Sequence, residues 1–204
     1  MPRKPRPPLP RVGRPGTGGR HRRASPFTAT SATAALIDEL GQPQIEIRNQ
    51  VHLLMWPVSS NGNGILAARL SGPETMGNET IMGQIHPLRA LAERHQLTPR
   101  LIIAAINATG SARYEHRADF EVIEEGINRG WCDWVAWKSP DRIGREVYPV
   151  ERFYDKVKNS GTGLYLTALG RAVDWNTDSD FSSFVVVSKQ QRHFTLSVRG
   201  ESDG

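Results

Sequence analysis

The chain of 204 residues contains a single cysteine, Cys132. One thiol excludes an intramolecular disulfide and any zinc site built from several cysteines, and it is typical of a protein from a reducing compartment. No run of apolar residues approaches the eighteen that a transmembrane helix needs, and no apolar stretch of signal-peptide length follows the basic start. We therefore expect a cytoplasmic protein that has no membrane partner.

Acidic residues are absent before Asp38, whereas residues 1–23 contain eight basic residues. The whole chain has 26 basic and 21 acidic residues, so the part after residue 23 has 18 basic against 21 acidic residues. The positive excess therefore belongs to the start of the chain, and it favours an anionic partner. Residues 1–34 are rich in Pro, Gly, Arg, Ser and Thr and poor in large apolar residues, which predicts a disordered basic tail.

The remainder is long enough for one sizeable hydrophobic core. For residues 35–60 the sequence allows either a linker or one or two short strands. The stretch "SSNGNG" at 59–64 has the composition of a turn. From residue 61 to 204 we expect one domain, because short apolar runs alternate with stretches of helical spacing. The expected strands are 65–70, 100–106, 133–137 and 162–169. This order predicts a three-layer α/β fold, with a mostly parallel sheet and helices on both of its faces.

Two strand ends in this pattern carry residues of interest. The first strand ends in "AARLSG", where Arg69 and Ser71 are two residues apart and point to the same side of an extended chain. A serine hydroxyl is a weak nucleophile, and a nearby guanidinium can both lower its pKa and bind a phosphate under attack. The alternative is a solvated arginine and a turn serine at an ordinary strand end.

After the third strand the chain reads "KSPDRIGRE". We expect Asp141 to cap a new helix, with Arg142 and Arg145 on one face of its first turn. Two arginines at a helix N-terminus oppose the helix dipole, and a bound phosphate would resolve that conflict. The alternative is that Asp141 pairs with one of the arginines on a solvated face.

Together these motifs resemble the serine recombinase (resolvase/invertase) family, whose catalytic domain has Tyr-x-Arg-x-Ser after its first strand and Asp-Arg-hydrophobic-x-Arg after its third. "AARLS" at 67–71 and "DRIGR" at 141–145 are similar to these patterns. Gln84 matches a glutamine of the family's first helix, and Arg117 matches an arginine in its Ser/Thr-Gly loop. The resemblance extends over about residues 65–175, and it implies a resolvase-like catalytic domain over residues 61–204 with a truncated C-terminal helix region.

The resemblance implies that the chain cleaves and rejoins double-stranded DNA through a phosphoserine intermediate on Ser71. Arginines 69, 142 and 145 would surround the phosphate with Arg117 close by, Asp141 would orient an arginine or help to move a proton, and Gln84 would be a supporting polar contact. Such a site works by positioning and charge, so we expect no metal and no cofactor. The family acts as homodimers that pair into a tetramer.

Two positions depart from the family pattern. Ala67 stands where the family has its tyrosine, and Asn107 stands where it has an acidic residue. These departures leave open a second function, in which an impaired or truncated recombinase keeps the fold and serves as a DNA-associated or protein-interaction module. The sequence does not favour an unrelated α/β hydrolase that uses Ser71, because the chain has neither a Gly-x-Ser-x-Gly elbow nor a His/Asp pair placed to activate this serine.

The ends of the chain permit alternatives as well. The stretch "DFSSFVVVSKQQRHFTLSVRG" at 180–200 could be the family's dimerisation helix, yet its β-branched residues equally favour a strand. The residues after it leave no room for a helix-turn-helix and contain no cysteines for a zinc ribbon, so we expect no such module within these 204 residues. The basic tail could bind DNA phosphates without base specificity, or it could be a solubilising segment with no role in binding.

Overall fold

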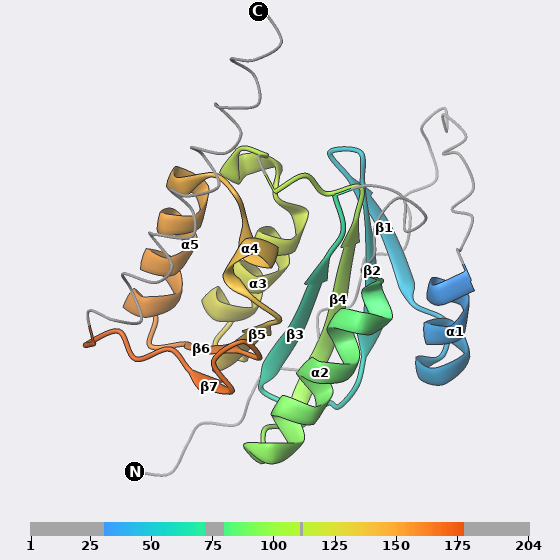
Figure 1. Ribbon diagram of the computed structural model, residues 1–204, viewed down its shortest axis with the longest axis horizontal. Helices are drawn as coiled ribbons and strands as arrows, with labels where there is room; N and C mark the ends of the chain where they lie inside the picture. Colours follow the sequence, from blue (N-terminus) through green and yellow to red (C-terminus); the bar gives the residue numbers. More distant parts are fainter. Residues whose placement is uncertain (1–30, 72–79, 111, 178–204) are drawn as a thin grey trace, which may run out of the picture.

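The computed structural model describes residues 31–71, 80–110 and 112–177. Within them seven strands form one sheet in the order β1-β2-β4-β3-β5-β6-β7, so that β3 lies at its centre (Figure 1). The strands are β1 (Gln44–Arg48), β2 (Val51–Pro57), β3 (Gly64–Arg69), β4 (Pro99–Ile106), β5 (Trp134–Trp137), β6 (Gly163–Leu166) and β7 (Arg171–Ala172).

The four strands at the centre of the sheet are parallel. β3 pairs with β4 on one side and with β5 on the other, and β6 continues the parallel pairing beyond β5. The outer strands β1, β2 and β7 are antiparallel to their neighbours. β3 and β5 are buried along their whole length, as strands covered on both faces must be. The predicted mostly parallel sheet is confirmed.

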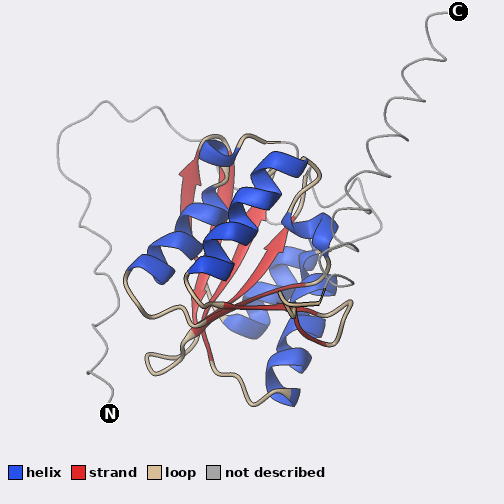
Figure 2. Cartoon of the chain, turned by 90° about the vertical axis from the view of Figure 1, so that its left-hand side faces the viewer, coloured by secondary structure: helices blue, strands red, loops and turns tan. Residues whose placement is uncertain are grey.

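Helices cover both faces of this sheet (Figure 2). α1 (Ser31–Leu40) and α2 (Ile81–Arg94) pack on one face. The other face carries the 3-10 turn η2 (Tyr114–His116), α3 (Ala118–Asn128), α4 (Pro140–Ile143) and α5 (Val147–Asn159). The predicted three-layer arrangement is therefore also confirmed.

The two hydrophobic cores follow from the alternation of side chains along β3. Ile65 and Ala67 belong to the core under α3 and α5, whereas Leu66 and Ala68 belong to the core under α1 and α2. All four side chains are fully buried, and such burial contributes roughly 1.5–3 kcal/mol for a residue the size of Leu66. Arg69 follows Ile65 and Ala67 at the same two-residue spacing, so its side chain also points to the face of α3 and α5.

The segment between the tail and the first predicted strand contains a β-hairpin in the structure. β1 and β2 pair from Gln44↔Met55 to Arg48↔Val51. The connecting residues Asn49 and Gln50 both have positive φ, as the tight turn of a two-residue hairpin requires. Residues 31–34, which we assigned to the tail, are the first residues of α1, whereas residues 1–30 and the stretch 180–200 lie outside the described part.

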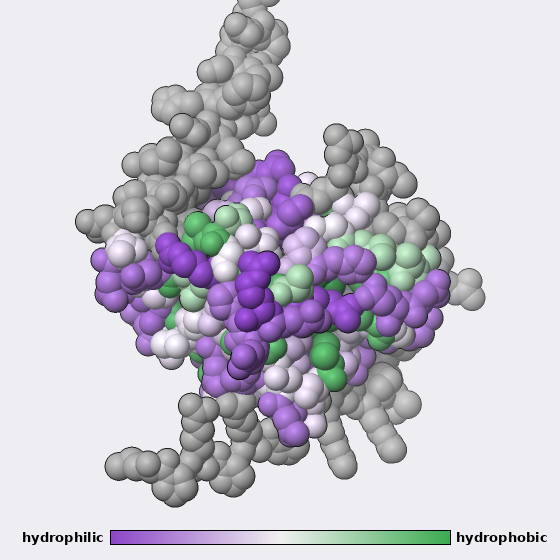
Figure 3. All heavy atoms as spheres, turned by 60° about the horizontal axis from the view of Figure 1, so that its bottom comes forward, coloured by the Kyte–Doolittle hydropathy of each residue, from purple (hydrophilic) through white to green (hydrophobic). Residues whose placement is uncertain are grey.

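Hydrophilic side chains cover most of the face shown in Figure 3, and the apolar residues between them form small separate patches. Among the helices that the structure describes, none has both the length and the apolar character to cross a membrane.

Candidate active site

The strand order reverses at β3. The connection through α2 leads from β3 to β4 on one face of the sheet, and the connection through α3 leads from β4 past β3 to β5 on the other face. In open α/β sheets, ligands bind at such a switch point, outside the carboxyl ends of the strands. This end of β3 and β4 points to the top of Figure 1 and carries Arg69, Leu70 and Ser71.

Gln84 fixes the backbone of Arg69 at this point. The parallel pairing of β3 with β5 ends at Leu66↔Ala136, so the peptide groups of Arg69 on that side have no strand to bind. The fully buried amide of Gln84 takes the place of that strand: Oε1 accepts from the Arg69 N–H at 3.2 Å, and Nε2 donates to the Arg69 carbonyl at 3.0 Å. Gln84 is thus a supporting polar group for β3, with its amide directed at the backbone.

The guanidinium of Arg69 binds three backbone carbonyls. Nη1 donates to Ala108 O, Nη2 to Asp141 O and Nε to Arg142 O, each at 2.8 Å. Arg69 is 1% exposed, so the alternative of a solvated arginine at an ordinary strand end is wrong. Its guanidinium thus binds both the loop after β4, at Ala108, and the segment after β5, at Asp141 and Arg142.

Arg117 is the second buried arginine of the group. Its Nε and Nη2 donate to the two carboxylate oxygens of Asp119 at 2.9 and 2.7 Å, and both side chains are 1% exposed. The guanidinium also lies over the ring of Phe120, 3.8 Å from its centroid. Within the described residues, Nη1 of Arg117 has no hydrogen-bond partner. Asp119 was not among the predicted site residues, although a carboxylate two residues after an arginine at a helix start is a usable signal.

The predicted helix start at Asp141 is wrong. α4 has only four residues and its N-cap is Ser139, so Asp141 lies inside it, while Arg145 lies beyond its end. The helix stops because Gly144 is fully extended and packs so tightly that a Cβ there would lie 2.5 Å from Val150 Cγ2. The dipole of so short a helix consequently does not favour a phosphate here, and attraction of an anion depends on the arginines themselves.

The Asp141 carboxylate contacts two side chains of the segment after β5, those of Ser139 and Arg142. Its Oδ1 accepts from Ser139 Oγ at 2.5 Å, and its Oδ2 lies 3.3 Å from Nε of Arg142. The pairing of Asp141 with an arginine, which was the alternative interpretation of this segment, is therefore present, and the side chain of Arg142 is partly exposed.

Gly110 brings Arg145 next to Arg69. The Arg145 N–H donates to Gly110 O at 2.9 Å. A Cβ on Gly110 would lie 2.8 Å from Arg69 Nη2 and 3.1 Å from Arg145 Cγ, so the two arginine side chains flank this glycine. A Cβ on Gly144 would lie 3.3 Å from Arg117 Nη1, which places Arg117 beside the same junction.

The charges of this group act on Arg69. Burial, together with the positive charges of Arg117, Arg145 and Arg142, lowers the pKa of Arg69 to about 10, while the charge of Asp119 opposes this shift. Three guanidinium groups thus lie close enough to repel that of Arg69, and Asp119 and Asp141 are the carboxylates paired with arginines of this group. An anion bound beside them would relieve this repulsion.

Ser71 is exposed and lies two residues beyond Arg69. Residues 72–79 after it are outside the described part. The structure therefore brings arginines 69, 117, 142 and 145 together with Asp141 and Gln84 around the switch point, and it places Ser71 on the strand end that leads out of this group.

The two departures from the family pattern have clear places in the fold. Ala67 is fully buried in the core under α3 and α5, so a tyrosine at this position would have to pack into that core. Asn107 follows β4 with a φ of 61°, a left-handed conformation that asparagine adopts more readily than most residues.

Among the described residues, no group of three or more His, Cys, Asp or Glu side chains could hold a metal ion. Burial raises the pKa of Cys132 to about 12, which keeps this thiol protonated and unreactive.

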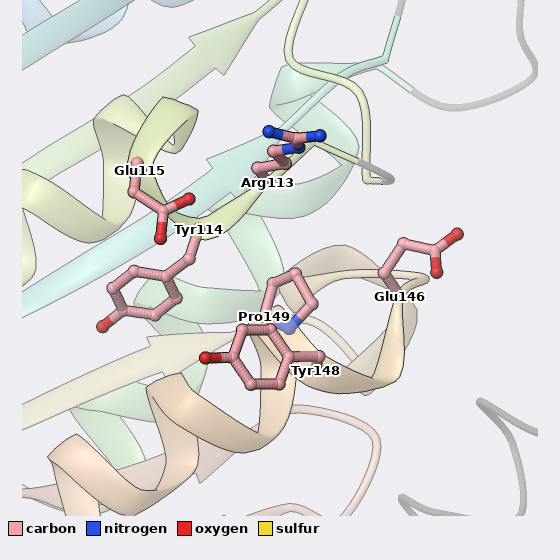
Figure 4. Close-up of a pocket in the computed structure, with 6 residues that line it drawn as sticks. All are labelled: Arg113, Tyr114, Glu115, Glu146, Tyr148 and Pro149. Atoms are coloured by element: carbon pink, nitrogen blue, oxygen red, sulfur yellow. The ribbon is translucent and has the colours of Figure 1, made fainter.

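A surface pocket of about 350 Å³ lies between η2 and the first turn of α5 (Figure 4). Its lining residues are Arg113, Tyr114, Glu115, Glu146, Tyr148 and Pro149. The two carboxylates would repel a phosphate, and the four clustered arginines are not part of the lining. We therefore place the candidate active site at the arginines and not in this pocket.

Comparison with known proteins shows the family and the fold of the chain. The family model described as "Resolvase, N terminal domain" matches residues 65–195. No curated protein matches the chain. Among solved structures, the fold is similar to the N-terminal catalytic domain of TP901-1 integrase, with a TM-score of 0.50 and 18% sequence identity over 66% of this chain and 97% of that chain.

Proposed function

Because the chain belongs to the serine recombinase family, we propose that it is a site-specific recombinase that cleaves and rejoins double-stranded DNA with Ser71 as its nucleophile. The observation that carries this proposal is the convergence of four arginines at the switch point of the sheet, beside the strand end that bears Ser71. Arginine is the residue that best matches the charge and planar geometry of a phosphate.

The reaction exchanges one phosphodiester for another. Ser71 Oγ loses its proton and attacks the phosphorus, so that a bond from Oγ to phosphorus forms. The bond to the 3′ oxygen of the leaving strand breaks, and this oxygen takes up a proton, which frees a 3′ hydroxyl. Attack of another 3′ hydroxyl on the phosphoserine reverses these steps, so the energy of the phosphodiester is conserved. Positioning and charge stabilisation by arginines account for such a step without a cofactor.

Arg142 and Arg145 are the arginines best placed to contact the phosphate. The side chain of Arg142 is 23% exposed, and Arg145 is also exposed. Asp141 lies 3.3 Å from Arg142 and would orient it, which favours the orienting role of this carboxylate over proton transfer. Homodimers that pair into tetramers would bring together the strands to be exchanged.

A second function stays open on a specific observation. Ala67 leaves no phenol beside the nucleophile, and Asn107 supplies no carboxylate at the end of β4. A chain that lost strand cleavage in this way would keep the fold and act as a DNA-associated or protein-interaction module.

Trapping of covalent protein–DNA complexes tests the proposal. We predict that the full chain, incubated with a radiolabelled pool of randomised DNA duplexes and quenched in detergent, retains label on the protein, and that Ser71→Ala abolishes this signal. The matched control is Ser60→Ala, at an exposed turn position before β3, which should retain the signal. Label that persists in Ser71→Ala would refute the assignment of the nucleophile, and absence of label from the unmodified chain would favour the non-cleaving module.

A further inference from the structure

We propose that the outer edge of β1 is a self-association surface, on which β1 of a second copy of the chain pairs in the antiparallel direction about a two-fold axis at Glu46. This inference goes beyond the proposed recombinase activity and does not depend on it. β1, β2 and α1 all precede residue 65, where the match to the family model begins. The edge therefore belongs to a part of the chain outside that match.

The backbone of β1 carries the first step. β1 is the outermost strand on its side of the sheet, and within the described residues no strand pairs with its outer edge (Figure 1). Arg48 and Val51 flank the two-residue turn of the hairpin, so they form a hydrogen-bonded pair, and this kind of pair recurs at every second residue. The N–H and C=O groups of Ile45 and Ile47 therefore point away from β2, where they can bind another strand.

The side chains of the same two residues carry the second step. Ile45 and Ile47 are 46% and 49% exposed. They lie opposite Leu54 and His52 of β2, and Leu54 belongs to the core under α1 and α2, so both isoleucines project on that face of the sheet. An edge strand that exposes neighbouring apolar side chains favours association with a further strand.

The order of residues along β1 carries the third step, because the strand is complementary to itself. A two-fold axis at Glu46 places Ile45 of one copy opposite Ile47 of the other. The residues whose backbone groups point outward then meet each other and exchange both of their hydrogen bonds, while the isoleucines of the two copies pack together. At the ends of the paired strands, Gln44 lies opposite Arg48 of the second copy. A contact of this kind uses the same patch on both copies and closes as a dimer.

The charged residues of β1 lie on the other face of the strand. Arg48 Nε donates to Glu46 at 2.8 Å, and its Nη1 donates to Glu121 of α3 at 3.1 Å. These contacts leave the face of Ile45 and Ile47 apolar. Two Glu46 carboxylates would still lie opposite each other at the axis, which opposes pairing. We therefore expect Glu46→Gln to strengthen the association.

The direction of β1 decides what such a contact can do. β1 is antiparallel to β2, β2 is antiparallel to β4, and β4 is parallel to β3, so β1 runs in the same direction as β3. Antiparallel pairing of two β1 strands thus places the two candidate active sites at opposite ends of the joined sheet. The contact would link copies that act on separate DNA segments, in addition to the homodimers of the proposed function.

Disulfide trapping in the full chain tests the register of this pairing. The native thiol of Cys132 is buried and stays protonated, so an introduced surface cysteine reacts alone. Residues directly opposite across antiparallel strands have Cα atoms about 4.5–5.5 Å apart, which suits a disulfide. We expect Glu46→Cys to form a cross-linked dimer under mild oxidation with copper phenanthroline. The matched control is Gln44→Cys on the same face, whose two copies would lie about 13 Å apart and should form no cross-link.

Analytical ultracentrifugation of the full chain measures the same contact without oxidation. Ile45→Lys and Ile47→Lys place a charge on the edge at positions that are already half exposed, so the fold should persist. Each should raise the dissociation constant for self-association at least tenfold, whereas Glu46→Gln should lower it severalfold. The control is Leu169→Lys, at an exposed position in the turn between β6 and β7 on the opposite side of the sheet, which should change nothing.

The two measurements together decide the proposal. Absence of a cross-link in Glu46→Cys, or an equal yield of cross-link in Gln44→Cys, would overturn the register about Glu46. A dissociation constant that both lysine variants leave unchanged would overturn the role of this edge in self-association.

Discussion

At the scale of single residues, the four arginines of the site divide into two kinds according to their surroundings. Arg69 and Arg117 are buried, and their donors bind backbone carbonyls and a carboxylate. Arg142 and Arg145 reach the surface. A buried charge must be paired and hydrogen-bonded, and the first two meet this requirement within the protein, whereas the side chains of the second two reach solvent.

The buried pair of Arg117 and Asp119 gives a prediction at this scale. Asp119→Asn removes the charge that faces Arg117 in a position with 1% exposure, and breaking a buried pair in this way costs about 3–5 kcal/mol. Urea unfolding should show a loss of that size. The control, Glu121→Gln, breaks the exposed contact with Arg48 and should cost less than about 1 kcal/mol. Equal losses in both variants would contradict the structural role of the buried pair.

Sequence alone can place Arg69 and Ser71 at a strand end, because the apolar run before them is clear. It cannot show where the Arg69 guanidinium points, since its acceptors are backbone carbonyls at positions 108, 141 and 142. Backbone groups carry no signal of residue type. The same limit applies to Gln84, whose partners are the peptide groups of Arg69.

At the scale of elements, the spacing of apolar residues predicted the helices and strands that are long and regular. Val147, Val150, Tyr154 and Val157 marked a helix face, and α5 spans Val147–Asn159 with the last three buried. α4 was misplaced because packing between Gly144 and Val150, which are six residues apart, sets its end. The hairpin of β1 and β2 could not be decided from sequence, since its place in the sheet depends on antiparallel pairing of β2 with the distant β4.

The contact between α1 and α2 gives a pH prediction at this scale. A hydrogen bond from His86, together with one from Arg89, holds the pKa of Glu39 below its ordinary value. A carboxylate whose pKa is lowered by folding stabilises the fold above the ordinary pKa of about 4.3, and this contribution disappears as pH falls through the lowered value.

The urea midpoint of Glu39→Gln should therefore lie below that of the unmodified chain at pH 7, and the two midpoints should converge as pH falls toward 3. Asp38→Asn, at an exposed position on the same helix, serves as control and should show no such convergence. A midpoint difference in Glu39→Gln that is independent of pH would contradict the ionic contact between α1 and α2.

At the scale of the whole molecule, positive charge is divided between two places. Eight basic residues lie in residues 1–23, and the rest of the chain has fewer basic than acidic residues. Within the described part, the arginines of the candidate site form a local exception to that balance. We therefore expect general affinity for DNA to come largely from the start of the chain and positioning of the phosphate to come from the site.

Removal of residues 1–30 tests this division and leaves α1 in place. Since each phosphate contact contributes about 0.9 to the salt slope, loss of several contacts should weaken binding to a random-sequence duplex by more than about tenfold at 50 mM salt. Titration of a fluorescent duplex measures the effect. Unchanged affinity would assign no role in DNA binding to these residues.

The central claim is that Ser71 becomes covalently joined to DNA, and the direct measurement is mass spectrometry of the trapped complex after digestion with protease and nuclease. We predict a nucleotide attached through its 5′ phosphate to the peptide that contains Ser71, together with a free 3′ hydroxyl on the released strand. Attachment at any other residue, or a 3′ phosphate on the released strand, would contradict the account.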